Sequence, residues 1–267
     1  MTYDIPVKYD IKKTEKHYLI TAYLNFDEMN LRELYWDLRI IANKYGIENE
    51  IRARFTSNYW KNNFYLTNRQ YSAGEGHMTF PYYTKGGCLA FLYRQDSEYD
   101  AYSTKIKEMA ASAIYVLFKP ILKRKKIWLV YEKFCSMAQD NGYYFFKYCM
   151  ENLSEEEKKN IYYVIDKKAP DYEKIKEYDD HIIQFMSLKH VLYVLSAVLY
   201  VASDSRTHLY AWRCKTSLIR SKIDKRPIFF LQHGVTALKQ VGPLFGRKGS
   251  SPMTYFATTS QFEQDIV

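Results

Sequence analysis

The sequence predicts an α/β protein in which a small antiparallel β domain precedes a doubly wound, Rossmann-like domain. Up to about residue 95, short runs of β-branched and aromatic residues are separated by Asn, Gly and Asp. Between residues 102 and 126 the apolar period changes to three and four residues, as in a helix. After residue 126, strand-like and helix-like segments alternate with short connections, which is typical of a mostly parallel sheet with right-handed crossovers. We therefore divide the chain into residues 1–101, 102–126 and 127–267.

Composition and charge narrow the class of partner. The chain has 267 residues, of which 47% are hydrophobic, so it has room for one large domain or two ordinary ones with a proper core. Its 39 Lys and Arg residues against 30 Asp and Glu give a net charge of +9. Such a charge favours a polyanionic partner: nucleic acid, a phosphopolymer, a nucleotide or an acidic lipid. No nucleic-acid-binding motif accompanies the charge, so we do not expect nucleic acid.

Cysteine usage and hydropathy favour a cytoplasmic protein. Cys88, Cys135, Cys149 and Cys214 are widely spaced and form no Cys-x-x-Cys pair, so neither a zinc site nor a disulfide framework is expected. Reduced, buried thiols are the expectation, and we expect no metal and no cofactor. The first residues are polar rather than signal-like, and no apolar run reaches the roughly 18 residues of a membrane span.

The first expected domain is a β sandwich or an open barrel. Its strand-like segments are residues 17–26, 34–40, 51–55, 63–68, 77–84 and 88–95. Residues 73–76, Ala-Gly-Glu-Gly, form a turn between two of these segments. The turn lacks the following helix and the Lys-Ser/Thr pair of a phosphate loop, so it is not expected to bind a nucleotide.

An amphipathic helix is expected at residues 102–126. Its apolar stripe comprises Ile106, Met109, Ala110, Ala113, Leu117 and Ile121, and its end carries Lys119, Lys123, Arg124, Lys125 and Lys126. Pro120 is expected to kink or end the helix early. One interpretation is a helix that lies on an anionic membrane surface, which would place the protein peripherally on the inner face of the cell membrane. The other is a linker helix docked between two domains, with a solvated basic tail.

The third region predicts the position of a functional site. Strands are expected at residues 127–132, 161–166, 182–186, 198–203, 227–231 and 253–257, with helices at 141–152, 171–178, 188–197 and in the region through residue 219. In open α/β sheets ligands bind at the carboxyl ends of the strands. The segments at that edge are residues 132–141, 187, 203–205, 232–234 and 258–260. They are rich in small hydroxyl residues and helix starts, which hold phosphate, although each alone is more typical of a helix cap.

A histidine stands directly after one of these strands. The apolar run of residues 228–231 stops at Gln232-His233-Gly234. A histidine has an unperturbed pKa near 6.5, which suits proton abstraction at neutral pH. The adjacent Gly234 permits a substrate to approach the backbone closely. The alternative is a histidine that only makes a hydrogen bond within its loop.

Two motifs in this region resemble the CDP-glycerol glycerophosphotransferases, the enzymes that polymerise teichoic acids. The motifs are Gln139-Asp140-Asn141, which precedes an aromatic helix, and the His-Gly-x-x-x-Leu-Lys pattern of His233, Gly234, Leu238 and Lys239. The segments IYYVID and ATTSQFEQDI stand in matching order and spacing. The resemblance covers residues 125–267, and no motif of the family is seen before them.

The resemblance implies the acceptor-side half of a GT-B fold, an architecture of two Rossmann-like domains. The implied reaction is attack by a polyol hydroxyl of a polymeric or lipid-linked acceptor on the glycerol-bearing phosphorus of CDP-glycerol, with release of CMP. His233 matches the family's catalytic histidine and is the candidate base. Lys239 either offsets phosphate charge or is a solvated helix lysine. The residues expected to bind substrate are Asp140, Asn141, Ser203, Gln232, Gly234, Thr236 and Lys239.

Two departures from the family leave other functions open. The commoner form has Thr-Pro-Leu-Lys after His-Gly, whereas here Gly234 is followed by Val-Thr-Ala-Leu-Lys, so either the loop is shifted or the substrate differs. The second, nucleotide-binding half would follow residue 267, so we expect a fragment with little activity alone. The rival hypotheses are a GT-B glycosyltransferase that uses a sugar nucleotide and a non-enzymatic module that binds an anionic polymer or membrane.

Overall fold

The computed structural model describes residues 4–52, 66, 69–84, 88–211, 218–232, 234, 242–249 and 251–266. The chain divides into two compact units. The first unit runs to Glu98, and the second comprises the described residues from Tyr99 onward. Each unit is described below by itself.

The first unit is built from antiparallel strands. A four-stranded sheet has the order β3 (Tyr35–Asp37), β8 (Leu89–Gln95), β7 (His77–Tyr83), β6 (Tyr71–Ser72). Two hairpins, β1 (Lys8–Lys13) with β2 (Tyr18–Tyr23) and β4 (Arg39–Lys44) with β5 (Ile47–Arg52), form separate two-stranded sheets. A small core of Leu31, Ala73, Phe91 and Tyr93 packs between the elements of this unit.

Antiparallel pairing was expected here, but the described strands do not enclose a sandwich or a barrel. The apolar side chains of the hairpins stay in solvent: Tyr9 is 62% exposed and Ile47 is 65% exposed. Alternation of apolar residues therefore identified strands without identifying their partners, because pairing depends on contacts between distant segments. The expected strand at residues 63–68, apart from Leu66, and the end of the one at 51–55 lie outside the described residues.

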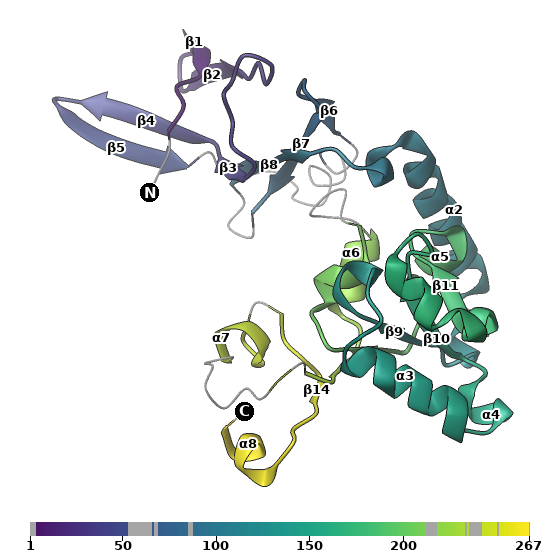
Figure 1. The fold of residues 1–267 in the computed structure, drawn as a ribbon. Coiled ribbons are helices and arrows are strands. Elements are labelled where there is room, and N and C mark those ends of the chain that lie inside the picture. Colours follow the sequence, from purple (N-terminus) through teal and green to yellow (C-terminus); the bar gives the residue numbers. More distant parts are fainter. Residues whose placement is uncertain are drawn as a thin grey trace. The chain divides into compact units, whose positions relative to one another are not determined.

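The second unit contains a six-stranded parallel sheet (Figure 1). Its order is β11 (Ile182–Gln184), β10 (Ile161–Ile165), β9 (Trp128–Tyr131), β12 (Leu199–Ala202), β13 (Ile228–Phe230), β14 (Tyr255–Phe256). In chain order these strands are the third, second, first, fourth, fifth and sixth, which is the order of doubly wound nucleotide-binding folds. The direction in which successive strands are added reverses between β9 and β12. The structure therefore confirms a parallel sheet with the strand order of a Rossmann-like domain.

Helices connect the strands as expected. They are α2 (Tyr102–Arg124), α3 (Asn141–Asn152), α4 (Glu155–Lys158), α5 (Leu188–Ser196), α6 (Leu218–Asp224), α7 (Gly242–Phe245) and α8 (Gln261–Ile266). Short 3-10 turns occur at η1 (Glu98–Asp100), η2 (Lys133–Cys135), η3 (Pro170–Lys174), η4 (Lys176–His181) and η5 (Arg206–Leu209). The expected helix at residues 171–178 is thus a pair of 3-10 turns. The short helices α4 and α7 were not anticipated.

The sheet has a hydrophobic cluster on each face because its buried strands are apolar on both sides. Leu129 and Tyr131 belong to the cluster that includes α5 and α6, whereas Val130 belongs to the cluster that includes α3. The alternation within β9 follows the two-residue period of a strand. Cys135 and Cys149 are buried free thiols in these clusters, as expected, and Cys214 lies outside the described residues.

Helix α2 is part of the second unit and packs against α5. Its buried side consists of Ala111, Tyr115 and Leu122. The predicted apolar stripe is the opposite, exposed side, on which Met109 is 64% and Leu117 is 74% exposed. The helix therefore has two apolar sides, and the sequence pattern selected the one that does not pack. Phe118 has non-helical angles (φ −108°), so the expected kink one turn before the end is confirmed.

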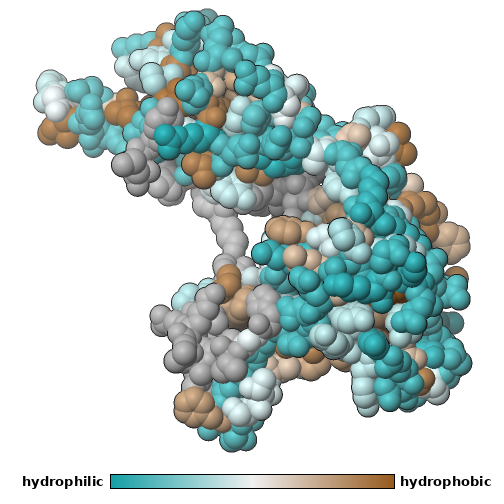
Figure 2. Space-filling view, viewed as in Figure 1, coloured by the Kyte–Doolittle hydropathy of each residue, from teal (hydrophilic) through white to brown (hydrophobic). Residues whose placement is uncertain are grey.

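The described helices include none that is both long enough and apolar enough to cross a membrane. Figure 2 shows hydrophobic side chains at the surface over α2.

Candidate functional site

The parallel sheet brings the segments that follow its strands to one edge, as the sequence predicted. The carboxyl-edge site, as we define it, comprises Glu132 after β9, Asp140 and Asn141 at the start of α3, Ser203 after β12 and Gln232 after β13. Of the other predicted residues, Gly234 is described and exposed. His233, Thr236 and Lys239 lie outside the described residues, so the structure neither supports nor contradicts their predicted roles.

The side chain of Glu132, which follows β9, lies against the amino terminus of α3. Its carboxylate accepts hydrogen bonds from the backbone N–H groups of Gln139 (3.0 Å), Asp140 (2.9 Å) and Tyr143 (2.7 Å), and the residue is only 1% exposed. Gly142 makes room for it, because a Cβ at Gly142 would stand 3.0 Å from Glu132 Cγ. Burial raises the pKa of Glu132, and the three N–H donors offset this only in part.

This arrangement has a consequence for phosphate binding. In doubly wound folds, a phosphate group commonly binds the N–H groups at the start of the helix after the first strand. Here those donors already bind a carboxylate of the chain itself. A phosphate at this position would have to displace Glu132 and would meet its negative charge. The start of α3 is therefore a closed anion site, and the sequence analysis did not foresee this use of Glu132.

Asp140 and Asn141 have structural partners. The Asp140 Oδ1 atom accepts from the backbone N–H of Asn141 (2.7 Å), which makes Asp140 the N-cap of α3. The Asn141 Nδ2 atom donates to the carbonyl oxygens of Leu231 (3.2 Å) and Gln232 (2.9 Å). Asn141 therefore ties the start of α3 to the segment that leads into His233, two strands away in the sheet.

Gln232 is held on its other side as well. It is buried, has a positive φ of 61°, and donates from Nε2 to the carbonyl oxygen of Ala257 after β14. Its Oε1 atom is buried and has no hydrogen-bond partner among the described residues. Ser203, which ends the neighbouring strand, is 1% exposed, so its hydroxyl does not face open solvent. Asn141 and Gln232 thus hold the backbone that precedes Gly234.

We predict that Asn141 acts through the position of this backbone. Asn141→Ala and Asn141→Asp both remove the Nδ2 donor, and the aspartate adds repulsion against two carbonyl oxygens. For the transferase reaction that the sequence predicts, we expect kcat to fall about tenfold to a hundredfold, with a smaller change in KM. Steady-state kinetics of nucleotide release would measure the changes in kcat and KM separately. An Asn141→Asp variant with wild-type kcat would contradict the positioning role.

The structure brings together an Asp–His pair that the sequence analysis missed. Asp204 Oδ1 lies 3.2 Å from His208 Nε2, just after β12. The His208 Nδ1 atom is buried without a hydrogen-bond partner in the described part of the chain. The Phe134 ring, after β9, packs edge-on against the imidazole at 4.5 Å between ring centres. The pair thus stands where the strand order reverses, the position at which such sheets bind ligands.

A local signal for this pair was present in the sequence. Asp204 and His208 are four residues apart, a spacing that places side chains on one side of a helical turn. Asp204 belongs to the predicted edge segment 203–205, whereas His208 falls in the region for which a helix is expected and which forms the 3-10 turn η5 here. In the loop that follows β9, the consecutive residues Phe134 (φ 56°) and Cys135 (φ 51°) have left-handed backbone angles, which the sequence does not indicate.

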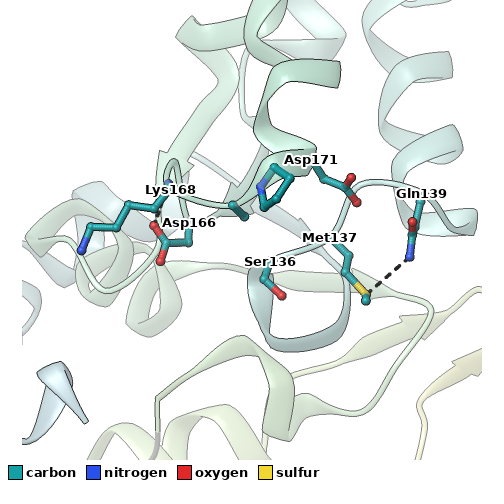
Figure 3. Close-up of a pocket in the computed structure, with 8 residues that line it drawn as sticks. Ser136, Met137, Gln139, Asp166, Lys168 and Asp171 are labelled. Atoms are coloured by element: carbon teal, nitrogen blue, oxygen red, sulfur yellow. Dashed lines mark hydrogen bonds between the residues drawn. The ribbon is translucent and has the colours of Figure 1, made fainter.

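A pocket of about 460 Å³ opens between the loops that follow β9 and β10 (Figure 3). Its lining is Ser136, Met137, Gln139, Asp166, Lys168, Ala169, Pro170 and Asp171. Burial acts to raise the pKa of Asp166, but hydrogen bonds from Lys168 N–H, Gln184 and Tyr99 outweigh it and hold that pKa below its ordinary value. The Asp171 carboxylate accepts from the Ala138 N–H (2.9 Å) and pairs with Lys174 (2.7 Å).

These groups fit hydroxyl-rich ligands better than phosphate. Both carboxylates in the pocket are kept ionised, and ionised carboxylates accept hydrogen bonds from hydroxyl groups but repel anions. In Figure 3 the Lys168 side chain extends away from Gln139, on the side of the pocket where Asp166 lies, whereas Asp171 lies on the side of Gln139. Across the described ranges, no three His, Cys, Asp or Glu residues are grouped so as to hold a metal ion.

The other edge residues are helix caps. The Ser187 hydroxyl accepts from the His190 N–H at the start of α5, and the Ser260 hydroxyl accepts from the Glu263 N–H at the start of α8. His190 itself is fully buried, and burial lowers its pKa to about 3, so it is a neutral core histidine.

Comparison with known proteins gives one curated relative. The chain is 31% identical over 135 residues to the minor teichoic acid biosynthesis protein GgaB of Bacillus subtilis (strain 168). The matched region is 49% of this chain and 14% of that protein, so the chain spans a small part of the length of its relative. No family model matches the chain. No solved structure matches it either. The second unit, with its parallel sheet and carboxyl-edge site, thus stands in a chain that is similar over half its length to a teichoic acid biosynthesis protein.

Proposed function

We propose that this chain forms the acceptor-side part of a transferase that builds a teichoic-acid-type polymer. The reaction transfers glycerol phosphate, or a related polyol phosphate, from CDP-glycerol to a terminal hydroxyl of a polyol-phosphate polymer or lipid-linked acceptor, and CMP leaves. The observation that carries the proposal is the similarity to a teichoic acid biosynthesis protein in a chain whose parallel sheet has a polar carboxyl edge.

The closed anion site supports the acceptor-side assignment. Glu132 fills the helix terminus at which a doubly wound domain commonly holds a nucleotide's phosphate groups. A GT-B enzyme binds its nucleotide donor mainly on the other domain, so the acceptor side has no need of that phosphate site. The neighbouring pocket, with Asp166 and Asp171, offers hydrogen-bond acceptors for the hydroxyl groups of a polyol or sugar.

The chemistry requires a base near the attacking hydroxyl. An alcohol is a poor nucleophile at neutral pH, and removal of its proton as the P–O bond forms lowers the barrier. His233 is the proposed base, because it follows β13 at the edge where Asn141 and Gln232 fix the backbone. The Asp204–His208 pair is the alternative base, since its carboxylate would stabilise a protonated imidazole.

A sugar-nucleotide donor is the second candidate. The name of the relative specifies teichoic acid biosynthesis but no donor, and the carboxylates of the pocket suit sugar hydroxyls as well as polyols. The complete protein would be incubated with CDP-glycerol, CDP-ribitol or a UDP-sugar, each with and without acceptor, and the released nucleotide measured. Acceptor-dependent release of CMP supports the polyol phosphate proposal, and release of UDP or UMP alone selects the second candidate. No release from any donor would overturn both.

A further inference from the structure

A cluster of cationic side chains stands at the amino edge of the parallel sheet. The basic pocket, as we define it, has a volume of about 160 Å³. It is lined by Tyr115, Lys119, Lys123, Lys222, Lys225 and Arg226. These residues come from α2, which leads into β9, and from the end of α6 and the segment after it, which lead into β13. Because both strands run parallel, the basic pocket lies at the edge opposite to the carboxyl-edge site.

The pocket concentrates positive charge. Five cationic side chains line it, and its described lining contains no carboxylate. The nearest acidic neighbour in the sequence, Asp224, pairs with Arg220 at 2.9 Å. Bringing several like charges together costs free energy, and a bound anion would offset that cost.

Arg226 is fixed in place and keeps a donor unused. Its carbonyl oxygen accepts from Arg206 Nε (3.1 Å) and Nη2 (2.9 Å), and its own Nη2 donates to the carbonyl oxygen of Leu195 (2.8 Å). Its Nε–H group is buried and has no hydrogen-bond partner among the residues that the structure describes. A buried donor without a partner is costly, and an oxygen atom of a bound anion would satisfy it.

The size of the pocket limits what the anion can be. Pockets that enclose a whole small molecule have volumes of about 300–1,000 Å³. The basic pocket, at about 160 Å³, suits a single phosphate group with slender substituents rather than a nucleotide. A fixed guanidinium group among lysines is a common way to recognise phosphate.

The two edges of the sheet suit different parts of one polymer. At the carboxyl edge, the ionised Asp166 and Asp171 accept from hydroxyl groups and repel phosphate. The amino edge offers phosphate five cationic partners. β9 spans four residues, so at about 3.3 Å per residue the two edges lie more than about 10 Å apart. A single glycerol phosphate is too short to reach both edges, whereas a polymer of several units is long enough.

We propose that the basic pocket binds a phosphate group of the polyol-phosphate polymer, several units away from the hydroxyl that reacts at the carboxyl edge. This inference rests on the proposed function for the identity of the polymer, and it adds a second contact on different residues. The second contact favours long acceptors over short ones, because only a long acceptor occupies both edges at once.

Isothermal titration calorimetry without any donor tests the proposal. The protein would be titrated with a soluble glycerol phosphate polymer, with the glycerol phosphate monomer and with inorganic phosphate, at low and high salt. We expect the polymer to bind more tightly than the monomer or inorganic phosphate, with an affinity that falls as salt rises. Lys222→Glu/Lys225→Glu should weaken binding of the polymer by about tenfold or more and reduce its salt dependence.

The matched control changes the same charge elsewhere. Lys12→Glu/Lys13→Glu, on the exposed strand β1, alters net charge equally and should leave the affinity for the polymer close to that of the wild type. Circular dichroism and thermal unfolding would verify that each variant folds, and Lys222→Gln/Lys225→Gln is a milder replacement. An equal loss in the control would indicate net charge alone and overturn the site, as would a wild-type protein that does not bind the polymer.

Two further probes separate the polymer from other phosphate ligands. Equal affinity for the monomer and the polymer would make the pocket a site for a small phosphate compound and overturn the polymer assignment. A single-stranded DNA oligonucleotide with the same number of phosphate groups should bind more weakly, because its nucleosides are bulkier than a polyol. Equal binding that depends equally on Lys222 and Lys225 would also overturn the assignment. Failure to release nucleotide from any donor would instead overturn the transferase, because the calorimetric result does not depend on catalysis.

Discussion

His233→Ala is expected to abolish most of the nucleotide release that belongs to the proposed transferase reaction. Removal of a general base typically lowers the rate by about 10²-fold to 10⁴-fold, so kcat should fall by that factor. KM for the donor should change little, because the base acts on the acceptor hydroxyl. The measurement is acceptor-dependent CMP release from CDP-glycerol. The pH profile of the wild type should show a group that must be deprotonated, and that limb should vanish in the variant.

Two further histidines make this experiment decisive. His17 lies on the exposed hairpin of the first unit, so His17→Ala should keep wild-type activity and serve as the matched control. His208→Ala should lower kcat less than His233→Ala if His233 is the base. A larger fall of kcat in His208→Ala than in His233→Ala would assign the base role to the Asp204–His208 pair. Wild-type activity in His233→Ala would refute the proposed role of His233 but not the transferase itself.

Glu132→Ala is expected to cause a large loss of stability in the second unit. The variant leaves three backbone N–H groups at the start of α3 without their acceptor in a buried position. Each hydrogen bond to a charged group contributes about 1.5–3 kcal/mol, and water can replace part of the loss, so the free energy of unfolding should fall by about 3–5 kcal/mol. Urea denaturation followed by circular dichroism would measure the change.

Gly142→Ala tests the same contact from the other side. A Cβ at Gly142 would approach Glu132 Cγ to 3.0 Å and the carbonyl oxygen of Tyr131 to 3.2 Å, so the carboxylate must shift off its donors. We expect a loss of about 1–3 kcal/mol, the range for overpacking. In Glu132→Ala the side-chain part of this clash is absent, so adding Gly142→Ala there should cost less than it does in the wild type. Additive losses would contradict the coupling.

The shifted pKa of Glu132 predicts in which direction the free energy of unfolding changes with pH. Its pKa is raised in the folded protein because burial penalises the carboxylate. A raised pKa means that its contribution is fully present below the ordinary value near 4.5 and is lost as pH rises through the folded pKa. The stability difference between the wild type and Glu132→Gln should therefore shrink from acidic to neutral pH. A difference that grows over this range would show that the three N–H donors dominate over burial.

Much of the second unit could be predicted because its elements are local. The run before His233 forms β13, and residues 141–152 form α3 with the predicted bounds. An apolar run bounded by polar residues specifies a strand, and a three- to four-residue period specifies a helix, whatever their neighbours. Parallel strands then place every following loop at one edge, so the carboxyl-edge site was accessible from the residues alone.

Other features could not be predicted because they depend on segments far apart in the chain. Asn141 reaches carbonyl oxygens about 90 residues later, and Glu132 closes the helix terminus through a bend of the chain. Lys119 and Lys222, more than 100 residues apart, line one pocket because α2 and α6 both pack on the same face of the sheet. Helix α2 carries apolar residues on two sides, and the period of its sequence does not say which side will be buried.

The sequence by itself thus determined which segments form helices and strands, their order, and the edge of the sheet at which the polar residues after the strands lie. Only the tertiary structure decided how those polar groups are used. Glu132 and Asn141 serve the protein's own backbone, whereas the buried His208 Nδ1 and Arg226 Nε atoms have no hydrogen-bond partner among the described residues. The physical reason is that backbone conformation follows from neighbours in sequence, whereas burial and hydrogen-bond partners follow from packing between distant segments.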